Sequence, residues 1–430
     1  MKYKMKKIVK WNLERNPERR DFTVAPLLCM VFLGISCGIP LAAQENHSFD
    51  LTGSVSGEAN AFLENKSSVF SYPDKSLPDI GSTASIDGKL SFSRGYTALG
   101  LLDFTFSDSA VIGNKDGATV EKLSFKVNEL YADLNFGDLV YARAGKQRLS
   151  WGAGYVFNPS DPVNPPKDPT ASRAALEGVP CLKAEIIAKP VSLMTFAVVH
   201  DKLKETGYGA KLSTSVIPNS DVSVSGYWSP SQSWTAALNA SVAPLYELPG
   251  WDSILVWTEA SVYEKDRYAA FDDDNPLIPR ADDSSGVETA ILTGASAKFP
   301  VLNTMVLAEY YHLLEGLSKD QIAAVLASPF WYGELARRPG RLARDYLFVS
   351  LTQSSITDTG NPVFDKIGLS ASCLANLTDL SSYVSGGMSL AFVDNASLGF
   401  DVHWANGGKD SEFGNALKRL SAGLKMSVFY

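Results

Sequence analysis

The feature that most constrains this sequence is an alternation of apolar and polar residues, which recurs from Phe49 to the end of the chain in segments of roughly ten residues. A period of two with one apolar face is typical of a β-strand that lies between two different environments. In the last segment every even position is apolar: Leu420, Ala422, Leu424, Met426, Val428 and Tyr430. Small or polar residues mostly fill the odd positions. The sequence therefore predicts an all-β protein.

We predict about eighteen antiparallel strands, or sixteen if a weak first strand lowers the count. Their connections alternate in length, because tight turns such as Gly137-Asp138 and Lys189-Pro190 alternate with long polar stretches such as 151–180 and 314–344. Two connections that this alternation predicts to be tight turns, 243–251 and 355–365, are longer than expected. The predicted strands are 49–62, 84–94, 96–107, 123–136, 139–150, 181–189, 191–200, 207–216, 221–228, 232–242, 252–263, 288–299, 303–313, 345–354, 366–375, 382–392, 396–404 and 418–430.

Charged residues on the second face of these strands distinguish a membrane barrel from a soluble sandwich. A dry sandwich core could not accept so many charges, because each buried charge needs a partner, whereas a water-filled lumen accepts them at little cost. We therefore predict a transmembrane barrel whose apolar face meets lipid. The strand residues expected in its lumen are Glu129, Asp133, Arg143, Gln147, Lys183, Glu185, Lys211, Lys298, Asp401, His403 and Lys425.

Residues 1–43 resemble an export signal, with a basic leader, an apolar run and small residues before a cleavage site near Ala43. Residues 44–430 are then expected to form a single barrel domain. The formal net charge is −8, and removal of the basic leader makes it more negative, which argues against nucleic acid as a partner. Only Cys181 and Cys373 follow the signal, too few for a disulfide framework.

A second resemblance is carried by Gly145-Lys146-Gln147, by Trp151-Gly152 and by the C-terminal strand Leu420–Tyr430 with its final aromatic residue. These segments and the overall strand plan resemble the outer-membrane β-barrel porins, including phosphate-selective-porin-like and related porins. The resemblance implies N- and C-termini in the periplasm, long extracellular loops, insertion by the barrel-assembly machinery through Leu420–Tyr430, and a homotrimer as a candidate assembly. No dense ladder of arginine or lysine supports phosphate selectivity.

Residues 151–180 form the third extracellular loop in this plan, and the resemblance implies that such a loop folds inward and narrows the pore. Five prolines between Pro159 and Pro169 stiffen its path. An exposed surface loop, or a simple cap on the barrel, is an equally good reading. The charged candidates for a constriction are Asp161, Lys167, Asp168, Arg173 and Glu177.

Two other loops carry recognisable patterns. The loop 314–344 contains a capping box at Ser318–Gln321, which predicts a short helix with Ile322, Val325 and Leu326 on one face. An acidic stretch at 272–274 could attract a divalent cation, but it lacks the spacing of a calcium loop, so we expect a solvated loop and no metal site.

Catalysis is not expected, because the four histidines are scattered and neither a nucleophile elbow nor a phosphate-binding loop is present. We predict no enzyme activity and no cofactor. The function that the sequence favours is an outer-membrane porin for passive diffusion of small hydrophilic solutes or ions. Two alternatives stay open: a surface-exposed barrel acting as an adhesin, and a transporter of hydrophobic substrates. The transported solute, its charge preference and the oligomeric state are not predicted.

Overall fold

A computed structural model describes residues 47–64, 79–94, 98–112, 119–137, 139–149, 151–164, 177–200, 202–230, 233–248, 253–264, 270–271, 279–280, 286–299, 303–327, 343–355, 364–416 and 418–430. The expected signal segment, the acidic stretch 272–274 and residues 165–176 of the loop 151–180 lie outside these residues. All structural statements below concern the described part of the chain.

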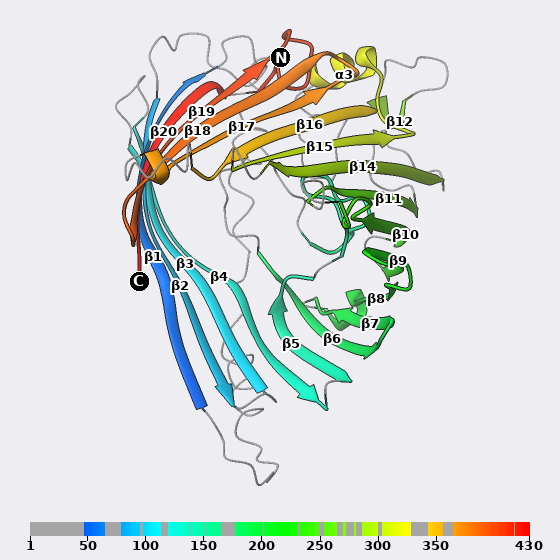
Figure 1. The fold of residues 1–430 in the computed structure, drawn as a ribbon. Helices are drawn as coiled ribbons and strands as arrows, with labels where there is room; N and C mark the ends of the chain where they lie inside the picture. The colour runs from blue at the N-terminus through cyan, green and yellow to red at the C-terminus, as the bar shows by residue number, and fades with distance from the viewer. Residues whose placement is uncertain are drawn as a thin grey trace. The chain divides into compact units, whose positions relative to one another are not determined.

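The chain forms one 18-stranded antiparallel sheet in which each strand pairs with the next strand along the sequence, and β20 pairs back with β1 to close a barrel (Figure 1). The upper strand count that we predicted is therefore correct. The strands are β1 His47–Glu64, β2 Asp79–Arg94, β3 Ala98–Ile112, β4 Thr119–Phe136, β5 Val140–Gln147, β6 Val179–Ala188, β7 Val191–Val198, β8 Gly207–Thr214, β9 Ser220–Ser229, β10 Ser233–Val242, β11 Leu255–Glu264, β14 Val287–Phe299, β15 Thr304–Leu313, β16 Asp345–Gln353, β17 Ile367–Asn376, β18 Ser381–Val393, β19 Ala396–Asn406 and β20 Lys418–Phe429.

The residue that follows the closing strand is held to β1. The backbone N–H of Tyr430 donates to the carbonyl oxygen of Gly53, and the N–H of Gly53 donates to the carbonyl oxygen of Tyr430, each at 3.0 Å. At the end of the barrel where β1 begins and β20 ends, most connections are short turns, whereas most connections at the other end are long. The exceptions that the sequence indicated, after β10 and after β16, are present, and the second contains the short 3-10 helix η3 Phe364–Lys366.

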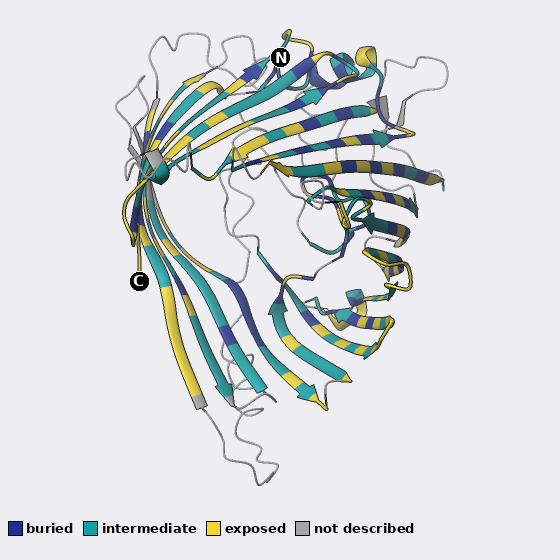
Figure 2. Cartoon of the chain, viewed as in Figure 1, coloured by how far each residue is buried: buried dark blue, intermediate teal, exposed yellow. Residues whose placement is uncertain are grey.

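The two faces of the sheet differ as the alternation predicts. Large apolar side chains such as Leu182, Phe400 and Leu424 are exposed on the outer face, as a lipid-facing wall requires. Their neighbours along each strand are more buried, which gives the alternating bands along β14, β15 and β16 in Figure 2. The sheet thus separates an apolar exterior from a different interior.

Strand β4 is the main departure from simple alternation. Its register with β3 shifts between the pairs Asp103–Glu129 and Phe104–Val127, which leaves Asn128 as the extra residue of a β-bulge. Exposed apolar residues therefore occupy odd positions before the bulge, at Leu123 and Phe125, and even positions after it, at Leu134 and Phe136. Leu130, which the alternation predicts on the outer face, is buried beside the bulge.

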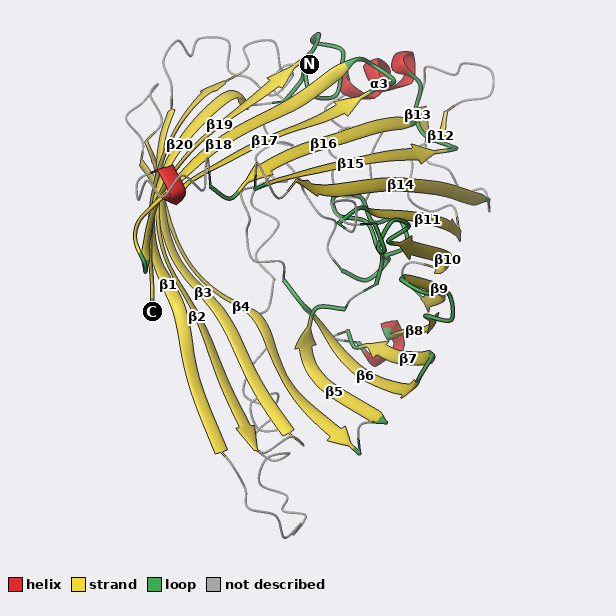
Figure 3. Ribbon diagram, viewed as in Figure 1, coloured by secondary structure: helices red, strands yellow, loops and turns green. Residues whose placement is uncertain are grey.

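Short elements complete the fold and are shown with the strands in Figure 3: the 3-10 helix η1 Leu203–Glu205, the helix α3 Lys319–Leu326 and a two-residue hairpin of β12 Ala270–Phe271 with β13 Pro279–Arg280. The helix begins at the predicted capping box, in which Ser318 and Gln321 each accept the other's backbone N–H. Its buried residues are Ile322, Val325 and Leu326, the apolar face that the sequence predicts.

No described helix combines the length and the hydropathy needed to cross a bilayer.

Candidate functional site

The site begins where the chain leaves the sheet at the end of β5. There the N–H of Gly178, just before β6, donates to the carbonyl oxygen of Asn128 at 2.9 Å. Gly178 therefore bonds to β4 beyond the point where the pairing of β4 with β5 ends. Gly145 makes the departure possible: its φ is +133°, and a Cβ at this position would overlap the backbone of Leu130 and Tyr131. The chain after Gln147 is therefore free to turn away from the wall.

The segment 151–164 lies within the curve of the sheet beside β11 (Figures 1 and 3). Glu259 of β11 holds its first part. This carboxylate accepts the backbone N–H groups of Ala153 and Gly154, and also the N–H and hydroxyl of Ser160 at 3.3 and 2.8 Å. Glu259 is fully buried, so these donors satisfy carboxyl oxygens that have no access to water.

Glu309 of β15 holds the middle of the same segment. Its carboxylate accepts the backbone N–H groups of Tyr155, of Val156 at 2.7 Å and of Phe157 at 3.2 Å. The indole of Trp257 donates a fourth hydrogen bond at 2.9 Å. Successive backbone N–H groups that converge on one carboxylate form an anion-binding concavity, here occupied by the protein's own side chain. Two buried glutamates therefore fix this segment to the inner wall.

Asp161 organises the turn that follows. Its carboxylate accepts the N–H of Val163 at 3.0 Å and the N–H and side-chain amide of Asn164 at 2.9 and 2.7 Å. Asn164 in turn bonds Leu149 in both directions, which joins the two ends of the segment. This candidate constriction residue thus has a clear role in local structure.

Apolar side chains seal the segment against the barrel. Trp151 packs edge-on against Phe196 of β7, with ring centroids 4.9 Å apart, and Lys211 of β8 donates to the carbonyl oxygen of Trp151 at 2.8 Å. Phe157 stacks on Tyr311 of β15 at 5.0 Å, within a cluster that also contains the apolar face of α3. The inner wall from β7 to β16 is therefore covered by protein.

A second inward contact comes from residues 407–415. Glu412 accepts the hydroxyl of the buried Tyr346 at 2.6 Å and the amide of Asn376 at 2.8 Å, while Phe413 joins the cluster around α3. The Tyr346 hydroxyl also accepts the N–H of Ala343 at 2.8 Å. We call β7–β11 and β14–β16 with these covering segments the covered wall.

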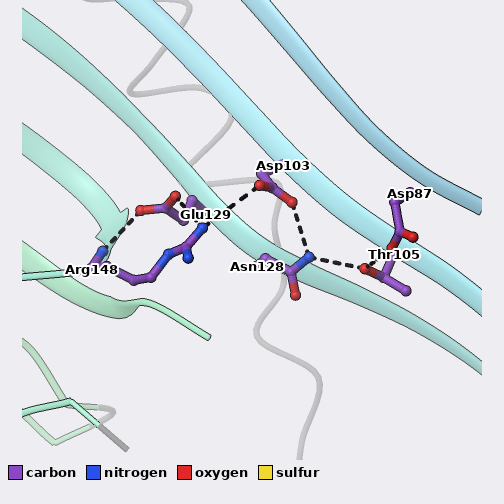
Figure 4. A network of polar contacts seen from close by, with 6 residues as sticks. All are labelled: Asp87, Asp103, Thr105, Asn128, Glu129 and Arg148. Carbon is purple, nitrogen blue, oxygen red and sulfur yellow. Dashed lines mark hydrogen bonds and ion pairs between the residues drawn. The ribbon is translucent and has the colours of Figure 1, made fainter. Parts of the chain in front are cut away.

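The inner face of β1–β4 is different, because polar side chains there bond one another across strands (Figure 4). Thr105 donates to Asp87 at 2.6 Å, and the amide of Asn128 donates to Thr105 at 3.0 Å and to Asp103 at 2.9 Å. At the end of this chain of contacts, Arg148 donates to Glu129 at 2.9 Å. We call β1–β5 with β17–β20 the polar wall.

The other residues predicted for the lumen are placed as follows. Most of them pair with another charged side chain or lie opposite one in the neighbouring strand. Gln147 is different, because it is fully buried and its side-chain amide donates to the Cys181 carbonyl oxygen. Lys298 is exposed near the end of β14, and Lys167, Asp168 and Arg173 lie outside the described residues. The pairs are Asp133–Arg143 at 2.6 Å, Lys183–Glu185 at 3.6 Å and Asp401–His403 at 2.9 Å, with Lys425 opposite Glu58 in the register of β20 and β1.

Glu177 lies at the far end of the loop, just before β6. Burial by itself would raise the pKa of this carboxyl, but hydrogen bonds from Lys146 and from Lys126, the latter at 3.1 Å, outweigh it and hold the pKa below its ordinary value. The side chain is therefore ionised and tied to both neighbouring strands.

The residues that sequence reasoning missed are Glu259 and Glu309. Both occupy lumenal positions of predicted strands, so the alternation could have placed them among the inward charges. Nothing in the sequence marks their partners, which are backbone N–H groups about a hundred residues away or more. The described residues also contain no group of three or more His, Cys, Asp or Glu side chains arranged to hold a metal ion.

Comparison with known proteins bears on the fold alone. No family model matches the sequence, and no curated protein matches it. Among solved structures, the fold is similar to Acinetobacter baumannii OccAB3 (TM-score 0.51, 7% identity, covering 89% of this chain and 99% of that one) and to Pseudomonas aeruginosa OccK5 (0.50, 7%, 89% and 97%). Salmonella typhi OmpF, solved in complex with daunomycin, aligns over 89% of this chain and 97% of its own at 11% identity and a TM-score of 0.45. The chain thus has the fold of an outer-membrane porin-like β-barrel.

Proposed function

We propose that this chain is an outer-membrane channel through which small hydrophilic solutes or ions diffuse passively. The observation that carries the proposal is a closed 18-stranded barrel with an apolar outer face and charged pairs on its inner face. Barrels of 16 to 18 strands are generally wide enough to leave an aqueous channel. The similarity in fold to porin-like barrels supports the same conclusion.

The segment 151–164 would narrow this channel. Its anchoring to Glu259 and Glu309 supports a fixed position, because seven hydrogen bonds from the segment would have to break before it could move away. We propose that Asp161 and Glu177, together with Lys167, Asp168 and Arg173, contribute the charges that solutes meet near it. Solutes would pass along the polar wall, since the covered wall is occupied by protein.

The setting of the channel is proposed on the same basis. The exposed apolar belt supports insertion into the outer membrane, with cleavage of a signal segment near Ala43, both termini periplasmic and the long connections outside. The closing strand β20 is the segment that we expect the barrel-assembly machinery to recognise. A homotrimer is the assembly to test first.

Planar-bilayer recording of the refolded protein tests the proposal. We expect stepwise currents, and we expect Glu309→Gln to alter the unit current because the middle of the segment loses its charged acceptor. Asp394→Asn in the tight turn between β18 and β19 is the matched control and should conduct as the wild type does. A correctly folded barrel that carries no current would contradict the channel and favour the surface-binding alternative.

A further inference from the structure

Tyr155 is the one large side chain that the segment 151–164 leaves exposed, with 48% of its surface accessible. Its neighbours along the chain, Gly154 and Val156, are buried, and Val156 belongs to the apolar cluster against the covered wall. The hydroxyl and ring of Tyr155 form no hydrogen bond or aromatic pair with the described residues. Because the segment lies within the curve of the sheet, a side chain that does not pack on the covered wall faces the lumen (Figure 3).

The backbone that carries this ring is fixed. The N–H of Tyr155 donates to Glu309, which lies near the middle of β15, so the ring is placed well inside the barrel and away from both of its ends. A Cβ at Gly154 would overlap the carbonyl oxygen of Phe157 and the side chain of Leu292, which shows that the backbone lies directly against the wall. Because the segment is ordered in advance, a solute that packs on the ring pays little for ordering it.

The polar wall, along which solutes would pass, presents neutral hydroxyl groups to the lumen. Serine hydroxyls of the described residues bond across neighbouring strands in the pairs Ser48–Ser93 at 2.7 Å, Ser56–Ser85 at 2.7 Å, Ser107–Ser124 at 2.8 Å and Ser372–Ser385 at 2.6 Å. Their neighbours along the strands, such as Phe49 and Phe106, are exposed on the outer face, so the serines face inward. Each pair retains a hydroxyl donor and free acceptors for a solute. Charged side chains such as Asp133 and Arg143, 2.6 Å apart, neutralise one another.

We propose that Tyr155 is a stacking platform for neutral polyhydroxylated solutes that contain a pyranose ring, and that it thereby determines specificity in the channel. The inference rests on the proposed channel function. A pyranose has an apolar C–H face that packs on an aromatic ring, and its hydroxyl groups exchange hydrogen bonds with other neutral hydroxyl groups. A single aromatic contact is too weak to retain such a solute, which suits a molecule in transit.

Block of the ion current by maltotriose tests the platform in the refolded full barrel. Sorbitol, which has the hydroxyl groups but no pyranose ring, is the control solute, at the concentration that lowers the bulk conductivity equally. We expect maltotriose to reduce the wild-type current more than sorbitol does. Tyr155→Ala should raise the half-blocking concentration of maltotriose roughly two- to tenfold, which corresponds to the loss of one aromatic contact. Tyr155→Phe keeps the ring and should restore the block.

Tyr208→Ala is the matched control, since it removes an exposed tyrosine ring from the outer face. If conducting barrels are blocked equally by both solutes, or if Tyr155→Ala behaves like Tyr208→Ala, the platform is wrong while the channel stands. Block by tetramethylammonium that requires Tyr155, without block by maltotriose, would replace the sugar with a cation and overturn the proposed solute class. If folded barrels carry no current, the channel itself is wrong and the platform falls with it. Far-UV circular dichroism of each variant separates these results from misfolding.

Discussion

The covered wall and the polar wall are built from the same alternating strands, yet their inner faces have opposite characters. On the covered wall Leu292 and Tyr346 are completely buried beneath inward-folded segments. On the polar wall Arg143 and Asp133, which occupy comparable positions, remain about a quarter exposed. The strand period therefore sets which side chains face inward, but segments outside the strands decide whether those side chains meet protein or solvent.

Charge is handled differently on the two walls. Glu259 and Glu309 are fully buried and are satisfied chiefly by backbone N–H groups. Acids of the polar wall instead pair with nearby side chains, as Asp133 does with Arg143. A buried carboxylate without its donors is costly, whereas an exposed pair contributes little to stability. The comparison therefore predicts that acid substitutions destabilise the covered wall far more than the polar wall.

The largest expected effect is that of Glu309→Ala. This change leaves three backbone N–H groups and the Trp257 indole without their acceptor in a buried site, which should lower the free energy of unfolding by about 3–5 kcal/mol. Urea titration of the barrel in lipid vesicles measures this loss of unfolding free energy. Asp401→Ala on the polar wall is the control, with an expected loss of about 1 kcal/mol or less. Equal losses for the two variants would remove the distinction between the walls.

The sequence predicts which side chains face inward, but not the bulge in β4 or the segments that cover one wall. The faces of β19 and β20 followed from alternation because the outward residues there, such as Phe400 and Leu424, are uniformly apolar. The bulge at Asn128 was not predicted, because a one-residue insertion changes the register with β3 without changing local composition. The contacts of Glu309 with Val156 and Phe157 were not predicted either, since backbone donors carry no side-chain signature.

Ile322→Ala in α3 should have the next largest effect. The side chain is completely buried against the covered wall, so its truncation should cost about 2–5 kcal/mol, depending on how far the surrounding side chains collapse into the space. Leu203→Ala in η1 is the matched control, because Leu203 is 79% exposed. The same urea titration compares them. A loss near zero for Ile322→Ala would mean that α3 does not contribute to the stability of the barrel.

Tyr346→Phe should cost less, about 1–2 kcal/mol. The ring stays in place, but the hydroxyl that links the N–H of Ala343 to Glu412 is lost, which loosens the contact between residues 407–415 and the covered wall. Tyr208→Phe is the control, since Tyr208 is exposed on the outer face. Hydrogen exchange should report faster opening at residues 407–415 in the first variant alone. Unchanged protection there would show that Phe413 holds this segment without the hydroxyl.

The smallest effect is expected at Glu177, which joins β4 and β5 through Lys126 and Lys146 beside the point where the chain turns inward. Because the folded pKa of Glu177 lies below its ordinary value of 4.5, its stabilising contribution is present above that pH and is lost as the pH falls through the folded pKa. The difference in urea midpoint between the wild type and Glu177→Gln should therefore correspond to about 1 kcal/mol or less at pH ~7 and vanish in more acidic solution. Taking this difference cancels the titration of the remaining carboxylates, and Glu205→Gln in the exposed helix η1 provides the reference for a carboxylate whose ion pair is solvated. A wild-type advantage that persists at pH ~3 would mean that Glu177 stabilises the barrel through packing, and that its charge does not help to join β4 and β5.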